Sequence, residues 1–194
     1  MAELLPKLCF DPADLDGRIW LEIGFGAGEH LAWQAEAHPE ALLVGCEVYR
    51  NGIAALLRRI EQGGIRNIRL WPADARDLMD RLPDASVERA FLLFPDPWPK
   101  ARHAERRFIG PANLPALARI LAPGAELRVA TDDPTHLAWI LDHLPPHPAF
   151  RWRVEGPQDW RARPADWPAT RYEQKAVREG RRPAYLRFER RGPP

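Results

Sequence analysis

Along most of the chain, short apolar runs alternate with longer segments in which apolar residues recur with helical spacing. The short runs predict strands at 19–23, 42–47, 68–71, 89–94 and 126–130. The longer segments predict helices at 30–37, 51–62, 75–81, 114–121 and 134–144. Such alternation is typical of an α/β protein, in which helices cover both faces of a largely parallel sheet.

The alternation stops after the last of these helices. Two further β-like runs, at 150–154 and 184–189, flank a long stretch rich in Pro, Arg and Trp. We predict that they form a terminal antiparallel pair that closes one edge of the sheet. Three tryptophans of this region are expected to pack at that edge, with stacking on nucleotides as the alternative: Trp152, Trp160 and Trp167.

Length and composition predict a single domain spanning residues 1–194, long enough to bury a substantial core. No apolar run approaches the length of a membrane span, and the first residues lack the apolar core of a signal peptide. The two cysteines, Cys9 and Cys46, lie far apart and have no His or Cys at metal-binding spacing. We therefore expect a cytoplasmic protein with reduced thiols, no metal site, no membrane contact and no obligate protein partner, either a monomer or a homodimer.

The charge is unevenly divided, although the formal net charge is only +1. Residues 151–191 hold 12 Lys and Arg against 6 Asp and Glu, whereas residues 1–150 hold 16 against 21. The C-terminal part is therefore basic and the rest of the chain is acidic. This division suits a cationic cofactor in one part and a polyanion near the other, although a solvated basic tail has the same composition.

The stretch IWLEIGFGAGEH predicts a strand, a tight turn and the start of a helix. Its glycines Gly24, Gly26 and Gly28 permit a sharp turn and the close approach of a ligand. The spacing differs from the G-x-G-x-x-G of dinucleotide-binding loops, and carboxylates flank the turn at Glu22 and Glu29. S-adenosylmethionine, which carries a sulfonium and an α-ammonium group, suits these carboxylates better than a pyrophosphate does. A nicotinamide site, a flavin site and a purely structural turn are the alternatives.

An acidic residue lies at or just after the end of each later predicted strand, at Glu47, Asp74, Asp96 and the pair Asp132-Asp133. Ligands of parallel α/β sheets bind beyond these carboxyl ends, so the acids are expected to converge on one site. Glu47 is placed to bind both hydroxyls of a ribose, and Asp74 is placed to accept a hydrogen bond from an adenine amine. Helix caps are the alternative interpretation for Asp74 and Asp133.

A second stretch with candidate chemistry, FPDPWPKARHAERRF, follows the fourth predicted strand. Its three prolines stiffen the turn, so that Asp96 and Trp98 are expected to be held in place. A stiff turn with an acidic and an aromatic residue could hold a nucleic-acid base near a methyl donor, while the basic patch beside it binds the phosphates of the nucleic acid. A Trp98 buried in the core and a solvated basic face are the alternatives. The basic residues of the patch are Lys100, Arg102, His103, Arg106 and Arg107.

Several motifs, taken in their order along the chain, resemble those of the bacterial tRNA (guanine-N7)-methyltransferase family: LEIGFGAG, GCEV, FPDPWPKARHAERR, ATDD and TRYEQKAVREG. The resemblance extends over about residues 20–190, and the most specific part is PDPW-x-KxRHxxRR combined with a late T-[KR]-[FY]-E. It implies the class I methyltransferase fold, a Rossmann-like α/β sheet of seven mostly parallel strands in which the last is antiparallel. It also implies S-adenosylmethionine as the cofactor and tRNA as the partner.

The resemblance further implies roles for individual residues. The donor-binding residues would be Glu22, Gly24, Gly26, Glu47, Asp74 and Asp96, and Asp96 would also be the catalytic residue. The substrate-binding residues would be Lys100, Asp132, Thr170, Arg171, Tyr172 and Glu173. An RNA-contacting strip would consist of Arg102, His103, Arg106 and Arg107.

The implied reaction is methylation of N7 of a guanine in the tRNA variable loop, at position forty-six, which forms 7-methylguanosine. Guanine N7 is unprotonated at neutral pH and attacks a sulfonium methyl without a general base, so catalysis would consist mainly of alignment. Carboxylates such as Asp96 and Asp132 would stabilise the cationic base. The lead-in to the glycine loop is short and acidic, which predicts either weaker tRNA binding than in longer relatives or greater reliance on the tail that contains Arg181 and Arg182. A small-molecule methyltransferase and a catalytically inactive tRNA-binding module are the rival interpretations.

Overall fold

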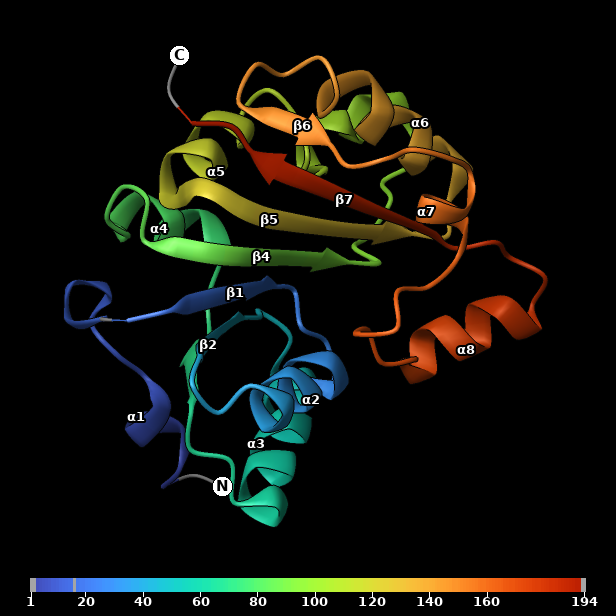
Figure 1. Ribbon diagram of the computed structural model, residues 1–194. Coiled ribbons are helices and arrows are strands. Elements are labelled where there is room, and N and C mark those ends of the chain that lie inside the picture. The colour runs from blue at the N-terminus through green and yellow to red at the C-terminus, as the bar shows by residue number, and fades with distance from the viewer. Residues whose placement is uncertain (1–2, 16, 193–194) are drawn as a thin grey trace.

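The computed structural model describes residues 3–15 and 17–192, which fold around one central sheet (Figure 1). Within these residues the sheet has seven strands in the order β3-β2-β1-β4-β5-β7-β6. The first five strands pair in parallel, and β7 is antiparallel to both of its neighbours. This is the class I methyltransferase architecture, and the prediction of a mostly parallel sheet with an antiparallel last strand is confirmed. The strands are β1 Ile19–Ile23, β2 Leu42–Cys46, β3 Ile68–Trp71, β4 Val87–Leu93, β5 Leu121–Thr131, β6 Phe150–Trp152 and β7 Ala184–Arg190.

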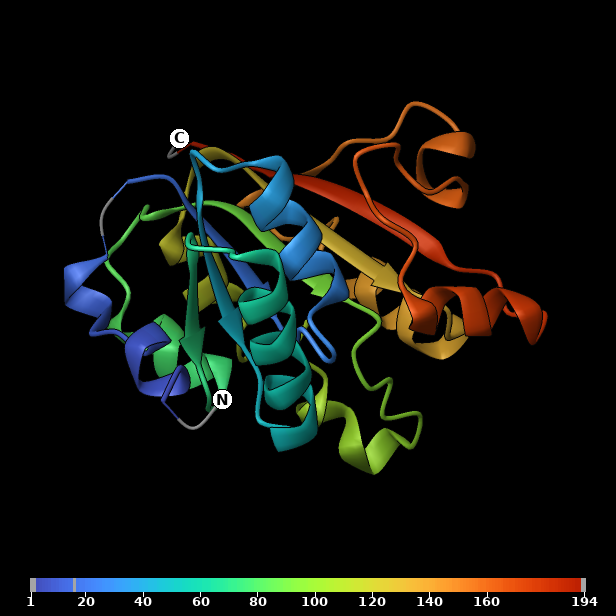
Figure 2. The ribbon, with the colours of Figure 1, turned by 90° about the horizontal axis from the view of Figure 1, so that it is seen from below.

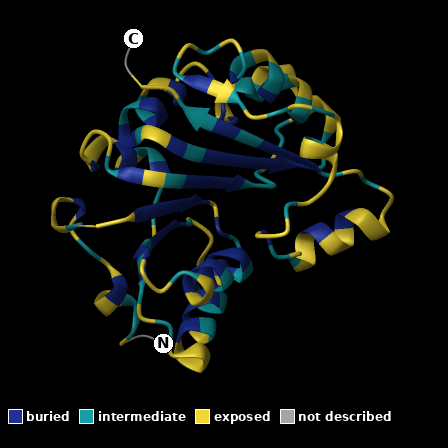
Figure 3. Ribbon diagram, viewed as in Figure 1, coloured by how far each residue is buried: buried dark blue, intermediate teal, exposed yellow. Residues whose placement is uncertain are grey.

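Helices cover both faces of the sheet, as the alternating pattern predicts. Apolar residues of α2 and α3 pack with one face, where the two helices lie side by side (Figure 2). Apolar residues of α4, α5 and α6 pack with the other face, so the strands between the two layers are the most buried part of the chain (Figure 3). The helices are α1 Leu5–Leu8, α2 Glu29–Ala37, α3 Arg50–Gly63, α4 Ala75–Arg81, α5 Leu114–Ile120, α6 Pro134–His143, α7 Gln158–Arg161 and α8 Arg171–Arg178, with 3₁₀ turns η1 Pro12–Asp14 and η2 Ala101–Arg106.

The predicted strands and helices are present, with differences mainly at their ends. β5 begins at Leu121, directly after α5, because its first residue already pairs with Val87 of β4. The helix α8 was not predicted. Its apolar content is low, and only Glu173 and Ala176 are buried, so it lacks the apolar residues from which the other helices are predicted.

The two C-terminal strands pair as predicted, and the last strand of the chain lies inside the sheet between β5 and β6. Packing of tryptophans on this side is also confirmed. Trp167 is fully buried against Ala130 and Tyr185, and the ring of Trp152 stacks on Phe188 at a centroid distance of 6.2 Å. In the described part of the chain, no helix is both long and apolar enough to cross a membrane.

Candidate functional site

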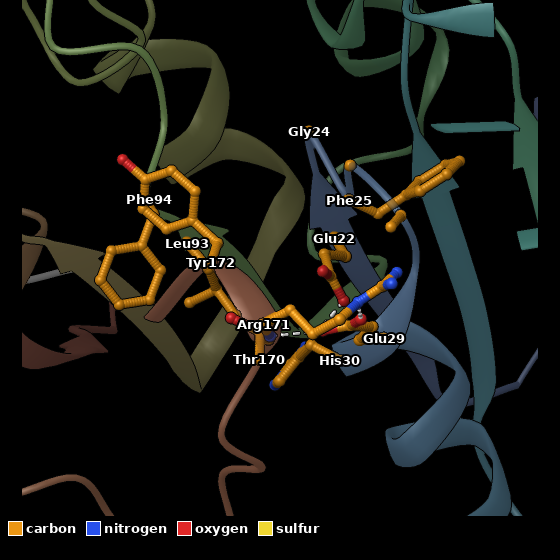
Figure 4. A pocket seen from close by; sticks show the side chains of 12 residues that line it. Glu22, Gly24, Phe25, Glu29, His30, Leu93, Phe94, Thr170, Arg171 and Tyr172 are labelled. Atoms are coloured by element: carbon orange, nitrogen blue, oxygen red, sulfur yellow. Dashed lines mark hydrogen bonds and ion pairs between the residues drawn. The ribbon is translucent and has the colours of Figure 1, made fainter. Parts of the chain in front are cut away.

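The carboxyl ends of the parallel strands border two neighbouring cavities. The first cavity, of about 320 Å³, lies between the β1–α2 loop, the end of β4 and the start of α8 (Figure 4). The second cavity, of about 160 Å³, lies between the ends of β1 and β2 and the start of α4. Gly24 lines both cavities, so the glycine loop forms their common wall. The two cavities together are thus bordered by three strand ends that carry acids.

The glycine loop has a backbone that residues with side chains rarely adopt. Gly24, Gly26 and Gly28 all have positive φ, at 70°, 56° and 71°. A Cβ at Gly28 would also lie 2.6 Å from the Leu56 side chain of α3, so the glycine lets this helix approach the loop closely. The three glycines are therefore needed for the shape of the turn, as the sequence predicts.

Glu22 is the penultimate residue of β1 and is buried, at 3% exposure, in the wall of the first cavity. Its Oε2 atom lies 2.7 Å from Nδ1 of His30, on the first turn of α2. A buried carboxylate is costly unless it is paired or hydrogen-bonded, so this contact stabilises the charge at the cavity wall. The arrangement places a negative group where the sequence predicts one for a cationic ligand.

Glu29, the other carboxylate beside the loop, is already occupied by the protein itself. It forms ion pairs with Arg59 of α3, at 3.2 Å, and with Arg171 at the start of α8. It also accepts a hydrogen bond from the Arg171 backbone N–H at 2.6 Å. Glu29 therefore joins α8 to the glycine loop, and of the two acids only Glu22 has no Arg or Lys partner among the described residues.

Glu47, directly after β2, lines the second cavity. Its carboxylate accepts three backbone hydrogen bonds, from Gly26 at 2.8 Å, Val48 at 2.8 Å and Tyr49 at 2.9 Å. A carboxylate has about four acceptor sites, so Glu47 has room for a ligand hydroxyl while its own orientation is held. The bond to Gly26 also couples this acid to the glycine loop.

Asp74 both caps a helix and lines the second cavity. Its side chain accepts a hydrogen bond from the Arg76 N–H at 2.9 Å and pairs with the Arg76 guanidinium, which confirms the helix-cap interpretation. The side chain is 45% exposed and borders the cavity beside Glu47. Asp133 likewise caps α6 by accepting from the His136 N–H at 2.8 Å.

The proline-rich turn after β4 has an unusual backbone on both sides of Asp96. Phe94 and Trp98 have positive φ, at 51° and 43°, and neither is a glycine. Such conformations cost free energy and often occur at functional sites. Phe94 lines the first cavity, and the exposed Asp96 follows two residues later. The turn is held from behind by Arg107, which donates to the carbonyls of Pro97 and Trp98 at 2.9–3.2 Å.

Arg107 differs in this respect from the other residues of the basic run. It is buried, and its guanidinium lies over the Trp139 ring at 4.6 Å. Arg102 and Arg106 are exposed on η2, and the Arg106 guanidinium lies over the Trp98 ring at 4.7 Å. Trp98 is half-buried in this cluster and is no part of the core. Two further members of the run are Lys100, which is exposed, and His103, which is half-buried.

The start of α8 closes the first cavity from the side opposite the glycine loop. Thr170 caps the helix by accepting from the Glu173 N–H at 3.2 Å, and Arg171 is tied to the glycine loop through Glu29. The Tyr172 ring lies 5.4 Å from that of Phe94, and its hydroxyl lies 3.4 Å from the Asp132 carboxylate. Asp132, after the end of β5, and Tyr172, in the first turn of α8, are thus brought together although forty residues separate them in the chain.

Glu173 points away from the first cavity. It is buried, it accepts a hydrogen bond from the Tyr185 hydroxyl at 2.5 Å, and it pairs with Arg163 at 3.0 Å. Burial, followed by the bond to Glu173, raises the pKa of Tyr185 well above its usual value. Arg181 is similarly engaged, because it pairs with Asp132 and with Glu179. These residues support the substrate side of the site from behind.

The chain is similar to known proteins in family, sequence and fold. A family profile described as "Putative methyltransferase" matches residues 16–185. The chain is 58% identical to a tRNA (guanine-N(7)-)-methyltransferase of Rhodospirillum rubrum over 174 residues, which cover 90% of this chain and 68% of the relative. It is 50% identical to a protein of the same name from Paramagnetospirillum magneticum, with 97% of this chain and 84% of the relative covered.

Solved structures show the same fold at low identity. An rRNA methylase from Streptococcus thermophilus matches with a TM-score of 0.60 at 13% identity, covering 98% of this chain and 93% of that one. The antibiotic-resistance methyltransferase Kmr matches with a TM-score of 0.59 at 23% identity, covering 94% and 91%. These matches support the class I methyltransferase architecture described above.

Proposed function

Because the chain belongs to the tRNA (guanine-N7)-methyltransferase family, we propose that it transfers a methyl group from S-adenosylmethionine to N7 of guanine forty-six in the tRNA variable loop. The observation that carries this proposal is the pair of cavities on either side of Gly24, each with a held carboxylate in its wall. The product would be 7-methylguanosine in tRNA, formed in the cytoplasm where tRNA is processed.

The residues of the two cavities fit the chemical groups of the donor. In the second cavity, Glu47 and Asp74 would bind the ribose hydroxyls and the adenine amine. In the first cavity, Glu22 would bind a cationic centre, and Gly24 and Gly26 would let the backbone approach the ligand. When bound, S-adenosylmethionine supplies an electrophilic methyl group on a sulfonium.

The substrate side needs positioning more than proton transfer, since guanine N7 carries a lone pair at neutral pH. Phe94 and Tyr172 would flank the base, and Asp132, held by Arg181, would accept its N–H groups. Asp96 would stabilise the positive charge that the purine gains, as a preformed electrostatic partner. Alignment of this kind is worth about 7–11 kcal/mol of the barrier at most.

The RNA side of the proposal rests on the basic residues beside the proline-rich turn. Lys100, Arg102, His103 and Arg106 would contact the tRNA backbone on the η2 side of the first cavity. Arg107, from its buried position, would act by holding the turn that carries Asp96. Thr170, Arg171 and Tyr172 would contact the substrate from α8, with Glu173 as the support of that helix.

Incubation of bulk tRNA with labelled S-adenosylmethionine, followed by nucleoside analysis, tests the proposal directly. Label is expected in 7-methylguanosine, and it is expected to disappear with a transcript in which adenine replaces guanine forty-six. Asp96→Asn is expected to lower kcat by roughly 100-fold, the usual effect of removing one preorganised electrostatic partner. Asp142→Asn, at an exposed position of α6, is the matched control. Full turnover of Asp96→Asn would remove Asp96 from the mechanism.

A further inference from the structure

We propose that His30 and Gln34 of α2 are positioning residues that hold the Glu22 carboxylate for the methyl donor. The inference rests on the proposed function, since it takes Glu22 to be a donor ligand. It also assigns a role to the backbone carbonyl of Asp166, which fixes the orientation of the Gln34 amide. Two residues of α2 and a carbonyl 132 positions after Gln34 thus determine the geometry of one carboxylate.

The first contact of this network is buried. His30 and Glu22 are 2% and 3% exposed, and Nδ1 of His30 lies 2.7 Å from Oε2 of Glu22. The other oxygen of Glu22, Oε1, accepts no hydrogen bond from the residues that the structure describes, and Glu22 borders the first cavity (Figure 4). One oxygen is therefore held by the protein, and the other is left for a ligand.

Gln34, one helical turn after His30, decides which ring nitrogen carries the hydrogen. Its amide nitrogen lies 3.2 Å from the Asp166 carbonyl oxygen and 3.1 Å from Nε2 of His30. The Asp166 carbonyl is only an acceptor, so the amide nitrogen must face it, and the second amide hydrogen then points to His30. Nε2 of His30 must accept this hydrogen. The hydrogen of the neutral imidazole consequently resides on Nδ1 and is donated to Glu22.

The Asp166 carbonyl is itself firmly placed. The carboxylate of Asp166 pairs with Arg128 at 2.5 Å, and Arg128 is 1% exposed within the sheet. The adjacent Trp167 is fully buried, with its ring 6.1 Å from that of His30. The segment before α8 is therefore anchored directly behind the donor site, and its carbonyl serves as a rigid reference for Gln34.

The chemical consequence concerns charge. A neutral imidazole donor orients the carboxylate without cancelling its charge, whereas an Arg or Lys partner would neutralise it. The protein uses such cationic partners for Glu29 on the neighbouring loop position, where Arg59 and Arg171 occupy the carboxylate. Glu22 thus has no Arg or Lys partner among the described residues and lies in a desolvated wall, where attraction to a cationic ligand is strongest.

Three ligands separate this role from a general effect on folding. S-adenosylmethionine carries a sulfonium and an ammonium, S-adenosylhomocysteine carries the ammonium, and 5′-methylthioadenosine carries neither. Their Kd values would be measured by calorimetry for the wild type, His30→Leu, His30→Asn and Gln34→Leu. Gln158→Leu, at an exposed position of α7, is the matched control for the glutamine change.

His30→Leu is expected to weaken both amino-acid-bearing ligands by roughly 10- to 100-fold, the range for a hydrogen bond to a charged group, and to leave 5′-methylthioadenosine within about twofold. His30→Asn, whose side-chain amide can replace the Nδ1 donor, is expected to restore most of the affinity. Gln34→Leu is expected to cost roughly 2- to 10-fold, with the same selectivity among the three ligands.

Equal losses for all three ligands, or unchanged binding in His30→Leu, would overturn the inference while the proposed function stands. Failure of the wild type to bind any of the three ligands would overturn the proposed function together with the inference. Retained methylation of tRNA by the wild type, measured in parallel, distinguishes the two cases.

Discussion

The approach of α3 to the glycine loop is closest at Gly52, and substitution of this residue tests the architecture of the donor site. A Cβ built on Gly52 would lie 2.3 Å from the Gly26 carbonyl oxygen and 3.5 Å from the Glu47 side chain. Real Cβ atoms essentially never approach closer than 3.0 Å, so Gly52→Ala must displace the loop or the helix by about 0.7 Å. The atom in the way belongs to the backbone, which cannot rotate aside as a side chain can.

Two opposing terms decide the size of the effect. Overpacking of this kind costs about 1–3 kcal/mol, whereas replacing Gly by Ala in a helix gains at most about 1 kcal/mol. We therefore expect net destabilisation of roughly 1–2 kcal/mol, seen as a fall in Tm of about 2–8 °C for a domain of this size. The displacement also disturbs the hydrogen bond from Gly26 to Glu47, so the Kd of S-adenosylmethionine is expected to rise about tenfold, equivalent to 1.4 kcal/mol.

The assay combines thermal unfolding with calorimetric titration of the donor. Gly156→Ala is the matched control, because a Cβ there meets no atom within 4 Å and its φ is not positive. The control is expected to bind the donor within about twofold of the wild type, since a surface change of this kind is nearly neutral. A folded Gly52→Ala protein that binds the donor as tightly as the wild type would refute this account of the loop.

Three further predictions concern tRNA binding and stability. Arg182→Ala is expected to reduce the magnitude of the slope of log K against log salt for tRNA binding by about 1. The reason is that Arg182 is exposed, whereas its neighbour Arg181 is engaged with Asp132. An unchanged slope would contradict this prediction. Arg128→Met is expected to reduce the free energy of unfolding in urea by about 1–3 kcal/mol, which is less than the roughly 3–5 kcal/mol for a fully buried pair because its partner Asp166 is half exposed. Unchanged stability would contradict the anchoring role. Burial, followed by the nearby Arg107, lowers the pKa of His136 from 6.5 to about 4. The neutral His136 side chain therefore contributes fully to the stability of the fold above pH 6.5, and this contribution is lost as the pH falls towards 4. His136→Leu is therefore expected to lose about 2 kcal/mol less than the wild type between pH 7 and pH 4.5, and parallel curves for the two proteins would refute the assignment.

Much of the site was predictable because strand ends are local features of the sequence. In a parallel sheet, the carboxyl ends of successive strands meet at one edge, so the acids at Glu22, Glu47 and Asp74 had to converge once the alternation was identified. The glycine turn was predictable for the same reason, since its three positive φ angles require the residue type that is present.

Other parts of the site depend on contacts between distant segments. The sequence contains no sign that Arg107 turns inward to hold the proline-rich turn while Arg106 remains exposed. The same holds for Glu29, whose flanking position suggests a ligand but whose partners are Arg59 and Arg171. Charge patterns specify which groups are available, whereas pairing is decided by which surfaces the fold brings together.

The sequence by itself therefore determined the parallel sheet, the antiparallel last strand and the edge at which the acids converge, because periodicity and turn residues act over a few positions. Only the tertiary structure decided which carboxylates of the site have cationic partners, as Glu29 and Asp74 do. His30 and Gln34 are two ordinary residues on a buried helix face until Asp166, 132 positions after Gln34, comes within hydrogen-bonding distance. That contact exists only because β5, β7 and the segment before α8 pack together, and packing at such separation leaves no periodic pattern in the chain.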